Sequence, residues 1–387
     1  MSDFRAVVGH SADPESVHAA AALIAQVEAG LPRPPQAGVL YAGIDYDHHA
    51  LLDTLLARWP DMQLVGCTTD GEASSVGGFQ ENSVSLMAFE SDRVRFGTGL
   101  GTQVSADPDR AGATAVAMAQ ARLGETPRLG IVLPESLTAS GVALLDGVRA
   151  ALPGQVPIVG GTAGDQWRLK HTRQFHLREV TSDACPVLLM GGDLHVSVGV
   201  QSGWRPVGRR GVVTRSEGNV VHEIDGAPAV DFYSRYLGSN LTASLFVGDI
   251  PLAVFDPEGR FFLRAPAGAN EQTGAMTFFA DVATGATVQL TVGAKDDVLA
   301  ASRSAVVDAV RTYPGTSPDA ALFFSCAARK QVLGTQASEE IGLLRGTLPP
   351  DVPVCGFYAY GEIGPLVPGG ASRFHNETFV AVLVGTH

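Results

Sequence analysis

Reactive side chains follow an apolar segment in the last quarter of the chain. Cys326 and Arg329 come shortly after residues 322–324, and His375 lies further along the sequence. A cysteine and a histidine can act as a nucleophile and its base, but a cysteine that ends a hydrophobic segment is more often a small buried residue. Arg329 could hold a ligand carboxylate, or it could pair with Glu362 or another acidic loop residue. Because no recognised nucleophile motif surrounds Cys326, we expect a binding protein and not an enzyme.

Two loops place a Gly-Glu pair at the same distance from a strand glycine. Glu72 follows Gly66 by six residues, and Glu362 follows Gly356 by six residues. The glycines could simply serve tight turns. An acidic residue at the carboxyl end of a strand lies where α/β folds bind ligands, and the alternative for both carboxylates is hydrogen bonding to loop amides.

We predict that one cavity is lined by these two loops together with Arg329 and His375. Asn82 and Asn376 each stand shortly before a final strand, which supports the match between the two copies. His375 and Asn376 could contact a ligand or tie the last strand to the loop. The candidate ligand-binding residues are Cys67, Thr68, Thr69, Gly71, Glu72, Cys326, Arg329, Tyr358, Tyr360, Glu362, His375 and Asn376.

The elements that position these loops come from a repeated unit. Ser-Ala-Asp-Pro occurs at residues 11–14 and again at 105–108, and the alanine-rich segment after each ends at a glycine, Gly30 or Gly124. The second set lies 94 residues after the first, which indicates that one structural unit was reused. Asp and Pro at the start of such a segment, with Gly at its end, are typical of a helix.

Strands alternate with helices in every copy. The third and looser copy is predicted to have its first strand at residues 290–293, a helix from Asp296 and a closing glycine at Gly356. This alternation predicts an α/β fold of two domains, built from repeated strand-helix-strand-helix-strand units whose sheets are flanked by helices.

Residues 191–287 do not fit the repeated unit and have the pattern of strands and hairpins. We therefore predict an N-terminal domain at residues 1–190 that contains two units. The predicted C-terminal domain, residues 191–387, contains the strand-rich insertion and the third unit. A chain of 387 residues has room for two domains of ordinary size.

The composition excludes several classes of partner. The formal net charge is −13, and both nucleic acids and anionic membranes require a basic face. No apolar run approaches the ~20 residues of a membrane span, and no secretory signal is visible. The four cysteines have no metal-ligand spacing. We expect a cytoplasmic protein with reduced thiols that neither binds nucleic acid nor inserts into a membrane.

Several ordered motifs resemble the FIST family of sensory domains over nearly the whole chain. The motifs that carry this resemblance are residues 65–72, 203–208, 213–229, 324–329, 356–362 and 375–379. The resemblance implies a FIST N-terminal part and a FIST C-terminal part, a ligand-sensing role in bacterial signal transduction, and a sensor without a fused output module. It further implies a small-molecule ligand and, as partner, a separate histidine kinase or another signalling protein.

Stand-alone relatives of this length resemble haem-binding nitric oxide sensors, so haem is the cofactor that the resemblance implies. Arg329 would then suit a haem propionate, and the candidate haem ligands are His10, His48, His49 and His375. Two alternatives remain open: a sensor of a colourless metabolite such as an amino acid, and a cysteine-dependent enzyme. The visible spectrum of the purified protein distinguishes a haem sensor from a sensor of a colourless metabolite.

Overall fold

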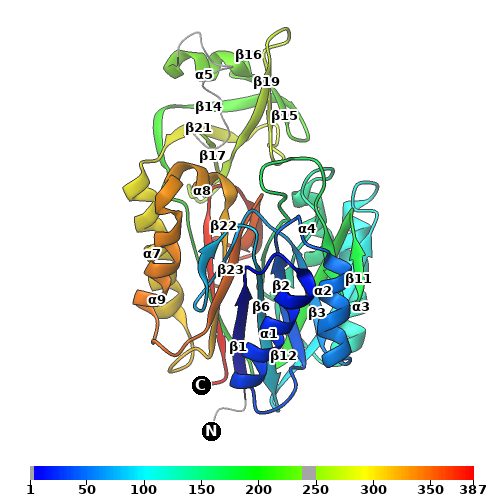
Figure 1. Ribbon diagram of the computed structural model, residues 1–387. Coiled ribbons are helices and arrows are strands. Elements are labelled where there is room, and N and C mark those ends of the chain that lie inside the picture. The colour runs from blue at the N-terminus through cyan, green and yellow to red at the C-terminus, as the bar shows by residue number, and fades with distance from the viewer. Residues whose placement is uncertain (1–3, 238–249) are drawn as a thin grey trace.

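The structure is a computed structural model that describes residues 4–237 and 250–387. Three α/β units pack against one another, and the strand-rich part lies at one end of them, at the top of the view in Figure 1. Several sheets are flanked by helices, so the α/β fold class predicted from the sequence is confirmed. The predicted domain division at residues 190 and 191 falls near the end of the last strand of unit two and stays a prediction.

Unit one has a four-stranded sheet in the order β1-β6-β2-β3, covered by α1 and α2. Its strands β2 and β3 are parallel, and β6 returns antiparallel to β2. The bounds are β1 (Phe4–Ser11), α1 (Ser16–Gly30), β2 (Ala37–Ala42), α2 (His48–Arg58), β3 (Gln63–Thr68) and β6 (Val84–Ser91).

Unit two repeats this arrangement in the order β7-β12-β8-β9, with α3 and α4 on its outer face. Asp107 accepts a hydrogen bond from the Arg110 amide, and Gly124 ends α3 in the left-handed conformation, so both predicted helix ends are confirmed. In unit one α1 begins later than its Asp-Pro pair, at Ser16. The bounds are β7 (Val94–Thr102), α3 (Pro108–Leu123), β8 (Pro127–Val132), α4 (Gly141–Ala151), β9 (Ile158–Gly161) and β12 (Ala184–Gly192).

Unit three has the same order, β13-β26-β22-β23, but its first strand is not at residues 290–293 as predicted. Residues 290–292 are the end of β21 (Thr287–Val292), a strand of the strand-rich sheet, and residue 293 follows it. The first strand of unit three is β13, which precedes that sheet in the sequence. The insertion therefore separates the first strand of unit three from its first helix. The bounds are β13 (His195–Gln201), α7 (Lys295–Thr312), β22 (Ala320–Cys326), α8 (Ala327–Leu333), η1 (Gly334–Gln336), α9 (Ala337–Thr347), β23 (Val354–Ala359) and β26 (Phe379–Gly385).

Each unit also lends a hairpin to the sheet of a neighbour. The hairpin of unit one joins β23 of unit three, that of unit two joins β3 of unit one, and that of unit three joins β9 of unit two. The exchange is therefore cyclic, and every unit is held by both others. The hairpin strands are β4 (Glu72–Ser74), β5 (Gly78–Gln80), β10 (Gln174–His176), β11 (Glu179–Thr181), β24 (Glu362–Pro365) and β25 (Ser372–His375).

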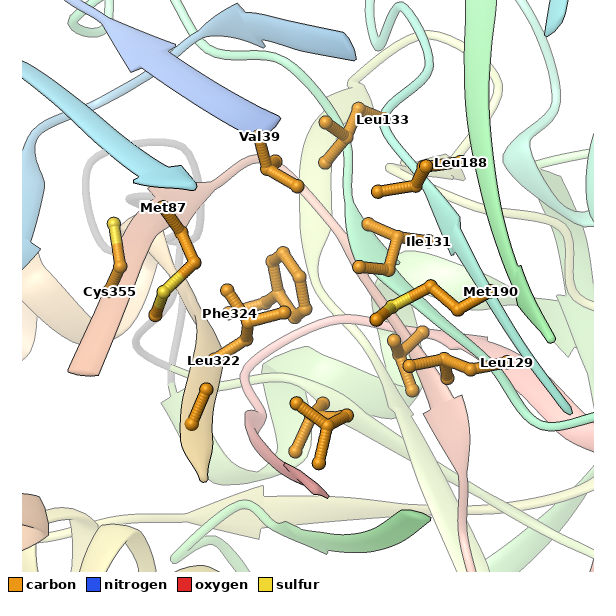
Figure 2. Close-up of a cluster of buried hydrophobic side chains, with 14 of the residues drawn as sticks. Val39, Met87, Leu129, Ile131, Leu133, Leu188, Met190, Leu322, Phe324 and Cys355 are labelled. Carbon is orange, nitrogen blue, oxygen red and sulfur yellow. The ribbon is translucent and has the colours of Figure 1, made fainter. Parts of the chain in front are cut away.

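The inner faces of the three sheets share one hydrophobic core. Figure 2 shows side chains from unit one (Val39), unit two (Ile131) and unit three (Phe324) in this core. Removing this much apolar surface from water is the main free energy that holds the units together. The helices pack on the outer faces of the sheets in separate apolar clusters. Because both faces of each sheet are covered, the loops at the ends of the strands are the part of each unit that is left to form a site.

The glycine that closes each unit is required by the close approach of two strands. Gly66, Gly160 and Gly356 lie opposite Leu40, Val132 and Phe323 of the adjacent parallel strand. A Cβ atom on any of the three would overlap the carbonyl oxygen of that neighbour. The expected positive φ is found at Gly71 (124°) and Gly160 (152°), while Gly66 and Gly356 are needed for space alone.

The strand-rich part forms an eight-stranded sheet with its own apolar cluster. It also contains a short helix, α5. The bounds are β14 (Arg205–Glu217), β15 (Val220–Ile224), β16 (Ala227–Pro228), α5 (Ala229–Leu237), β17 (Leu252–Phe255), β18 (Phe261–Arg264), β19 (Pro266–Asn270), β20 (Ala275–Phe278) and β21 (Thr287–Val292). Within the described residues, every helix is too short or too polar to cross a membrane.

Candidate functional site

Each exchanged hairpin begins with a polar residue that is fully buried. Glu72, Gln174 and Glu362 each lie opposite the residue that follows the closing glycine of the neighbouring unit. Gln174 is therefore the unit-two counterpart of the two glutamates. Unit two inserts a loop between its strand and its hairpin, which moves the equivalent position further along the chain.

Glu72 takes part in a buried polar chain inside unit one. Its carboxylate accepts hydrogen bonds from the Thr69 hydroxyl and from the Ser83 amide (3.1 Å) and hydroxyl (2.6 Å). Ser83 Oγ lies 2.9 Å from Nε2 of His10, whose Nδ1 lies 2.7 Å from Oγ of Ser74. Burial raises the pKa of Glu72 to about 7 and lowers that of His10 to about 4. The Glu72 carboxylate thus accepts a hydrogen bond from a loop amide, which is the alternative to ligand binding that the sequence left open.

Glu362 has the corresponding contacts in unit three. Its Oε2 accepts hydrogen bonds from the Thr378 amide (3.0 Å) and hydroxyl (2.9 Å). Its buried Oε1 has no hydrogen-bond partner among the described residues, and burial raises the pKa of Glu362 to about 8. Both glutamates therefore fasten the last strand of their unit to the first residue of its hairpin.

The asparagine match predicted from the sequence is wrong by one position. Asn82 and Glu377 each stand two residues before the last strand of their unit, and Asp183 stands one residue before it, with φ values of 54°, 60° and 55°. Asn82 therefore corresponds to Glu377 and not to Asn376. The left-handed conformation at this position favours Asn and Asp, which explains two of the three residues.

The inserted loop of unit two is organised around Asp165. Its carboxylate accepts hydrogen bonds from the amides of residues 169–171 and from the Tyr360 hydroxyl (2.6 Å) of unit three. The same hydroxyl accepts a hydrogen bond from the Trp167 amide at 2.6 Å. Burial opposes ionisation of Asp165, but these hydrogen bonds outweigh it and lower its pKa.

This loop has an unusual backbone. Gln166, Trp167 and Leu169 have φ values of 57°, 60° and 50°, which cost free energy for residues other than glycine. Trp167 packs against Tyr360, with ring centroids 5.7 Å apart, and its buried indole Nε1 has no hydrogen-bond partner among the described residues. Such strain is typical of loops that a surrounding structure holds for a function.

A charged cluster joins unit three to unit one beside this loop. Lys330, on α8, lies 2.8 Å from Oδ2 of Asp70 and 2.8 Å from Oε1 of Glu81, and it donates a hydrogen bond to the Asp70 carbonyl. The Asp70 side chain is fully buried, whereas that of Glu81 is 56% exposed. Burial raises the pKa of Asp70 to about 6, although Lys330 favours the ionised carboxylate.

Two adjoining cavities lie where the loops of the three units meet; we call this region the loop junction. The larger, about 470 Å³, is polar and open to solvent, with Asp70, Glu81, Gln166, Trp167 and Lys330 among its lining residues. The smaller is narrow and mainly apolar, and it shares Trp167 with the larger one. The smaller cavity is lined by Trp167, Leu169, Ala265, Phe279, Cys326, Ala327, Ala328, Tyr360 and Asn376.

The structure brings three of the predicted site residues together at the loop junction, namely Cys326, Tyr360 and Asn376. His375 lines a different cavity, beside β13 and β18. The remaining predicted residues line none of the five cavities described. These residues are Cys67, Thr68, Thr69, Gly71, Glu72, Arg329, Tyr358 and Glu362.

Arg329 is part of the interior of unit three. Its side chain is fully buried and pairs with Glu340 of α9 at 2.7 Å. It also donates hydrogen bonds to the Val298 carbonyl (2.9 Å) and the Ser302 hydroxyl (2.5 Å), and the Tyr358 hydroxyl lies 2.8 Å from Glu340. The acid that pairs with Arg329 is therefore on a helix and not in a loop. The Arg329 side chain has no exposed surface at which a ligand carboxylate or a haem propionate could bind.

The geometry gives little support to a Cys326–His375 nucleophile pair. Nε2 of His375 lies 2.9 Å from the Gly364 carbonyl oxygen, and burial raises the pKa of Cys326 well above its ordinary value. A thiol held in its neutral form is a poor nucleophile.

Of the four histidines predicted as haem ligands, only His375 lines one of the five cavities described. Its Nδ1 is buried and has no hydrogen-bond partner among the described residues. Both ring nitrogens of His10 lie next to serine hydroxyls, Nε2 of His48 bonds to the Gly43 carbonyl, and His49 is exposed on α2. Haem binding stays a prediction, with His375 as its first candidate ligand. Among the described residues, no cluster of three or more His, Cys, Asp or Glu could hold a metal ion.

The sequence reasoning did not single out four residues that line the loop junction: Asp70, Glu81, Trp167 and Lys330. Asp70 lies inside the Gly66 loop that was singled out, and Lys330 is adjacent to the chosen Arg329. Helix geometry offered a signal for Lys330. Neighbouring residues of a helix point in different directions, so only one of Arg329 and Lys330 could face the loops.

Several curated proteins are similar to this chain. An uncharacterized protein of Mycobacterium tuberculosis (strain H37Rv) is 33% identical over 65% of this chain and 66% of its own length. An uncharacterized protein of Mycobacterium bovis is 29% identical over 66% of this chain and 68% of its length. The chain thus spans about two thirds of the length of these relatives. Among solved structures, a cyanuric acid hydrolase from A. caulinodans aligns over 99% of this chain, with 11% identity and a TM-score of 0.38.

Two family models match consecutive parts of the chain and cover most of it. The FIST N domain matches residues 36–227, and the FIST C domain matches residues 229–365. The match agrees with the motifs singled out in the sequence. This chain therefore belongs to the FIST family.

Proposed function

We propose that this chain is a sensory protein that binds a small polar metabolite with an amino group, such as an amino acid, at the loop junction. FIST domains are sensory domains in signal transduction, and they occur here in both their N and C parts. The observation that carries the proposal is the cavity of about 470 Å³ that contains the Lys330 ion pairs.

The position of this cavity favours sensing. Asp70 belongs to unit one, Trp167 to unit two and Lys330 to unit three, so one bound molecule contacts all three units. Binding can shift a conformational equilibrium only through a difference in affinity between two states. A ligand that contacts three units at once binds with different affinity when the units change their relative positions. Its binding can therefore shift the equilibrium between two arrangements of the units.

The charges in the cavity favour a zwitterionic ligand. Lys330 already pairs with two carboxylates, and that of Glu81 is largely exposed. The ligand carboxylate would take the place of Glu81 beside Lys330, and the ligand ammonium would pair with the released Glu81 carboxylate. Phe79 and Trp167 provide an apolar wall for a side chain.

The strained loop at residues 165–169 is a candidate for the moving part. Its left-handed residues are held by the Asp165 carboxylate and the Tyr360 hydroxyl. A ligand stacked on Trp167 would stabilise one arrangement of this loop, and a partner protein such as a histidine kinase would read that arrangement. We propose binding rather than catalysis, because the described residues that line the cavity of about 470 Å³ include no cysteine, serine or threonine.

The test is a thermal-shift screen of the twenty amino acids and simple amines, followed by calorimetric titration of each positive compound. We expect saturable binding that Glu81→Gln and Trp167→Ala each weaken at least tenfold. Lys330→Met should abolish binding, whereas Lys170→Met, which removes a nearby exposed lysine, should leave it unchanged. Binding unaffected by Glu81→Gln and Trp167→Ala, or no binding by the native protein, would reject the site.

The narrower prediction of a haem-based nitric oxide sensor acting on a histidine kinase has a separate test. A haem titration of the purified protein gives a saturable Soret band if haem binds. His375→Ala should then remove or shift the band, while His49→Ala should not. Loss of the haem prediction leaves the amino-acid proposal untouched, since the two concern different cavities.

A further inference from the structure

A second cavity of about 420 Å³ lies between unit two and the strand-rich sheet, away from the loop junction. Its walls come from α4, from β18 and the segment around residue 282, and from β25 of the exchanged hairpin of unit three. In Figure 1 the strand-rich part lies above α4, and the cavity occupies this boundary.

Arg264 is the most informative residue of this cavity. It is only 4% exposed, yet no carboxylate of the described residues lies within 4 Å of its guanidinium. Its Nε donates a hydrogen bond to the Asp281 carbonyl (2.9 Å), and Nη1 donates to the carbonyls of Leu263 and Phe374 (3.0 Å each). Nη2 has no hydrogen-bond partner among the described residues. A buried cation without a counter-ion is costly, so an anion in the cavity would relieve a real penalty.

Arg373 brings a second guanidinium to the same cavity. Its side chain makes no hydrogen bond or ion pair with the described residues, and the guanidinium lies 5.4 Å from the centroid of the Phe262 ring. The guanidinium of Arg264 lies 4.5 Å from the same centroid. The two cations therefore share one aromatic ring instead of each pairing with an acid. Cation–π contacts of this kind hold the guanidiniums in place while their nitrogens remain available.

The remaining charges leave the cavity positive. Arg149 stands at the rim and pairs with Asp146 of the same helix at 3.4 Å. The carboxylate of Asp281 accepts a hydrogen bond from the Ser140 hydroxyl at 2.7 Å, and its charge partly offsets that of Arg264. Three arginines and two aspartates line the cavity, and none of the described carboxylates forms an ion pair with Arg264 or Arg373.

We propose that this cavity binds a small organic anion whose carboxylate or phosphate group is held by Arg264 and Arg373. Arginine forks match the geometry of both groups. The apolar part of the ligand would rest against Leu145, Val282 and Phe374, which also line the cavity. Because the walls come from different parts of the chain, the anion would also fasten the strand-rich sheet to unit two.

The test uses benzoate and phenyl phosphate as probes, with benzyl alcohol as their uncharged analogue, in calorimetric titrations of the full chain. We expect saturable binding of at least one anion and none of benzyl alcohol. The two anions distinguish a carboxylate site from a phosphate site. Arg373→Gln should weaken binding at least tenfold, and Arg128→Gln, which removes an exposed arginine elsewhere, should not change it.

Arg264→Lys is the second variant, because it keeps the charge but not the fork, and it should also weaken binding while circular dichroism remains native. Failure of both anions to bind the native protein overturns the proposal, as does equal binding by native protein and Arg373→Gln. Lys330→Met should bind the anion normally, so this site and the loop junction are tested independently.

Discussion

Glu362→Gln is the substitution that most directly tests how the exchanged hairpins are held. Glu362 is fully buried, and burial raises its pKa from the ordinary 4.5 to about 8. The amide oxygen of glutamine can accept the same two hydrogen bonds from Thr378. Unit two already has glutamine at the equivalent position, Gln174, so the fold accommodates the amide.

The sign of the pH effect follows from the raised pKa. Below pH 4.5 the carboxyl is protonated in the folded and the unfolded chain. As the pH rises towards 8, the unfolded chain ionises first, so the folded state loses stability. A tenfold change in proton affinity corresponds to about 1.4 kcal/mol, so the full loss by pH 8 is about 5 kcal/mol and the loss at pH 7 is about 3 kcal/mol.

The assay is urea unfolding of the native protein and of Glu362→Gln between pH 5 and 8.5. We expect the native free energy of unfolding to fall over this range and the variant to show a flatter profile. The part of the pH slope that is due to Glu72, whose pKa is about 7, should remain in Glu362→Gln. It should disappear in the double variant that also carries Glu72→Gln. Glu179→Gln, at an exposed position, serves as control. An identical slope in native protein and Glu362→Gln would refute the reasoning.

Three further predictions concern the core, the strand glycines and haem. Arg329→Met should lower the free energy of unfolding by about 3–5 kcal/mol, because it leaves Glu340 as a buried charge, and the added Glu340→Leu should recover part of the loss in urea unfolding. Gly66→Ala should destabilise by about 1–3 kcal/mol or more through overlap with the Leu40 carbonyl, whereas Gly342→Ala, at an open position of α9, should stabilise by up to about 1 kcal/mol. Any Soret band that haem produces should depend on His375 and not on His10; a band lost in His10→Ala but kept in His375→Ala would contradict this assignment.

The sequence alone determined the repeated α/β unit and much of its internal detail. The helix that begins at Pro108 and ends before Gly124, and the closing glycines Gly66 and Gly356, were all visible in the residues. These features depend on contacts between near neighbours in the chain. Capping, apolar periodicity and glycine placement therefore leave a local signal that can be read before the fold is known.

Only the tertiary structure decided which loops meet. The counterpart of Glu72 in unit two is Gln174 because the hairpins are exchanged between units, and no local pattern indicates that exchange. Arg329 and Lys330 are adjacent in the sequence, yet the first pairs with Glu340 inside unit three and the second with Asp70 of unit one. Helix geometry shows that adjacent side chains diverge, but the partner that each one finds depends on strand pairing between residues more than two hundred positions apart.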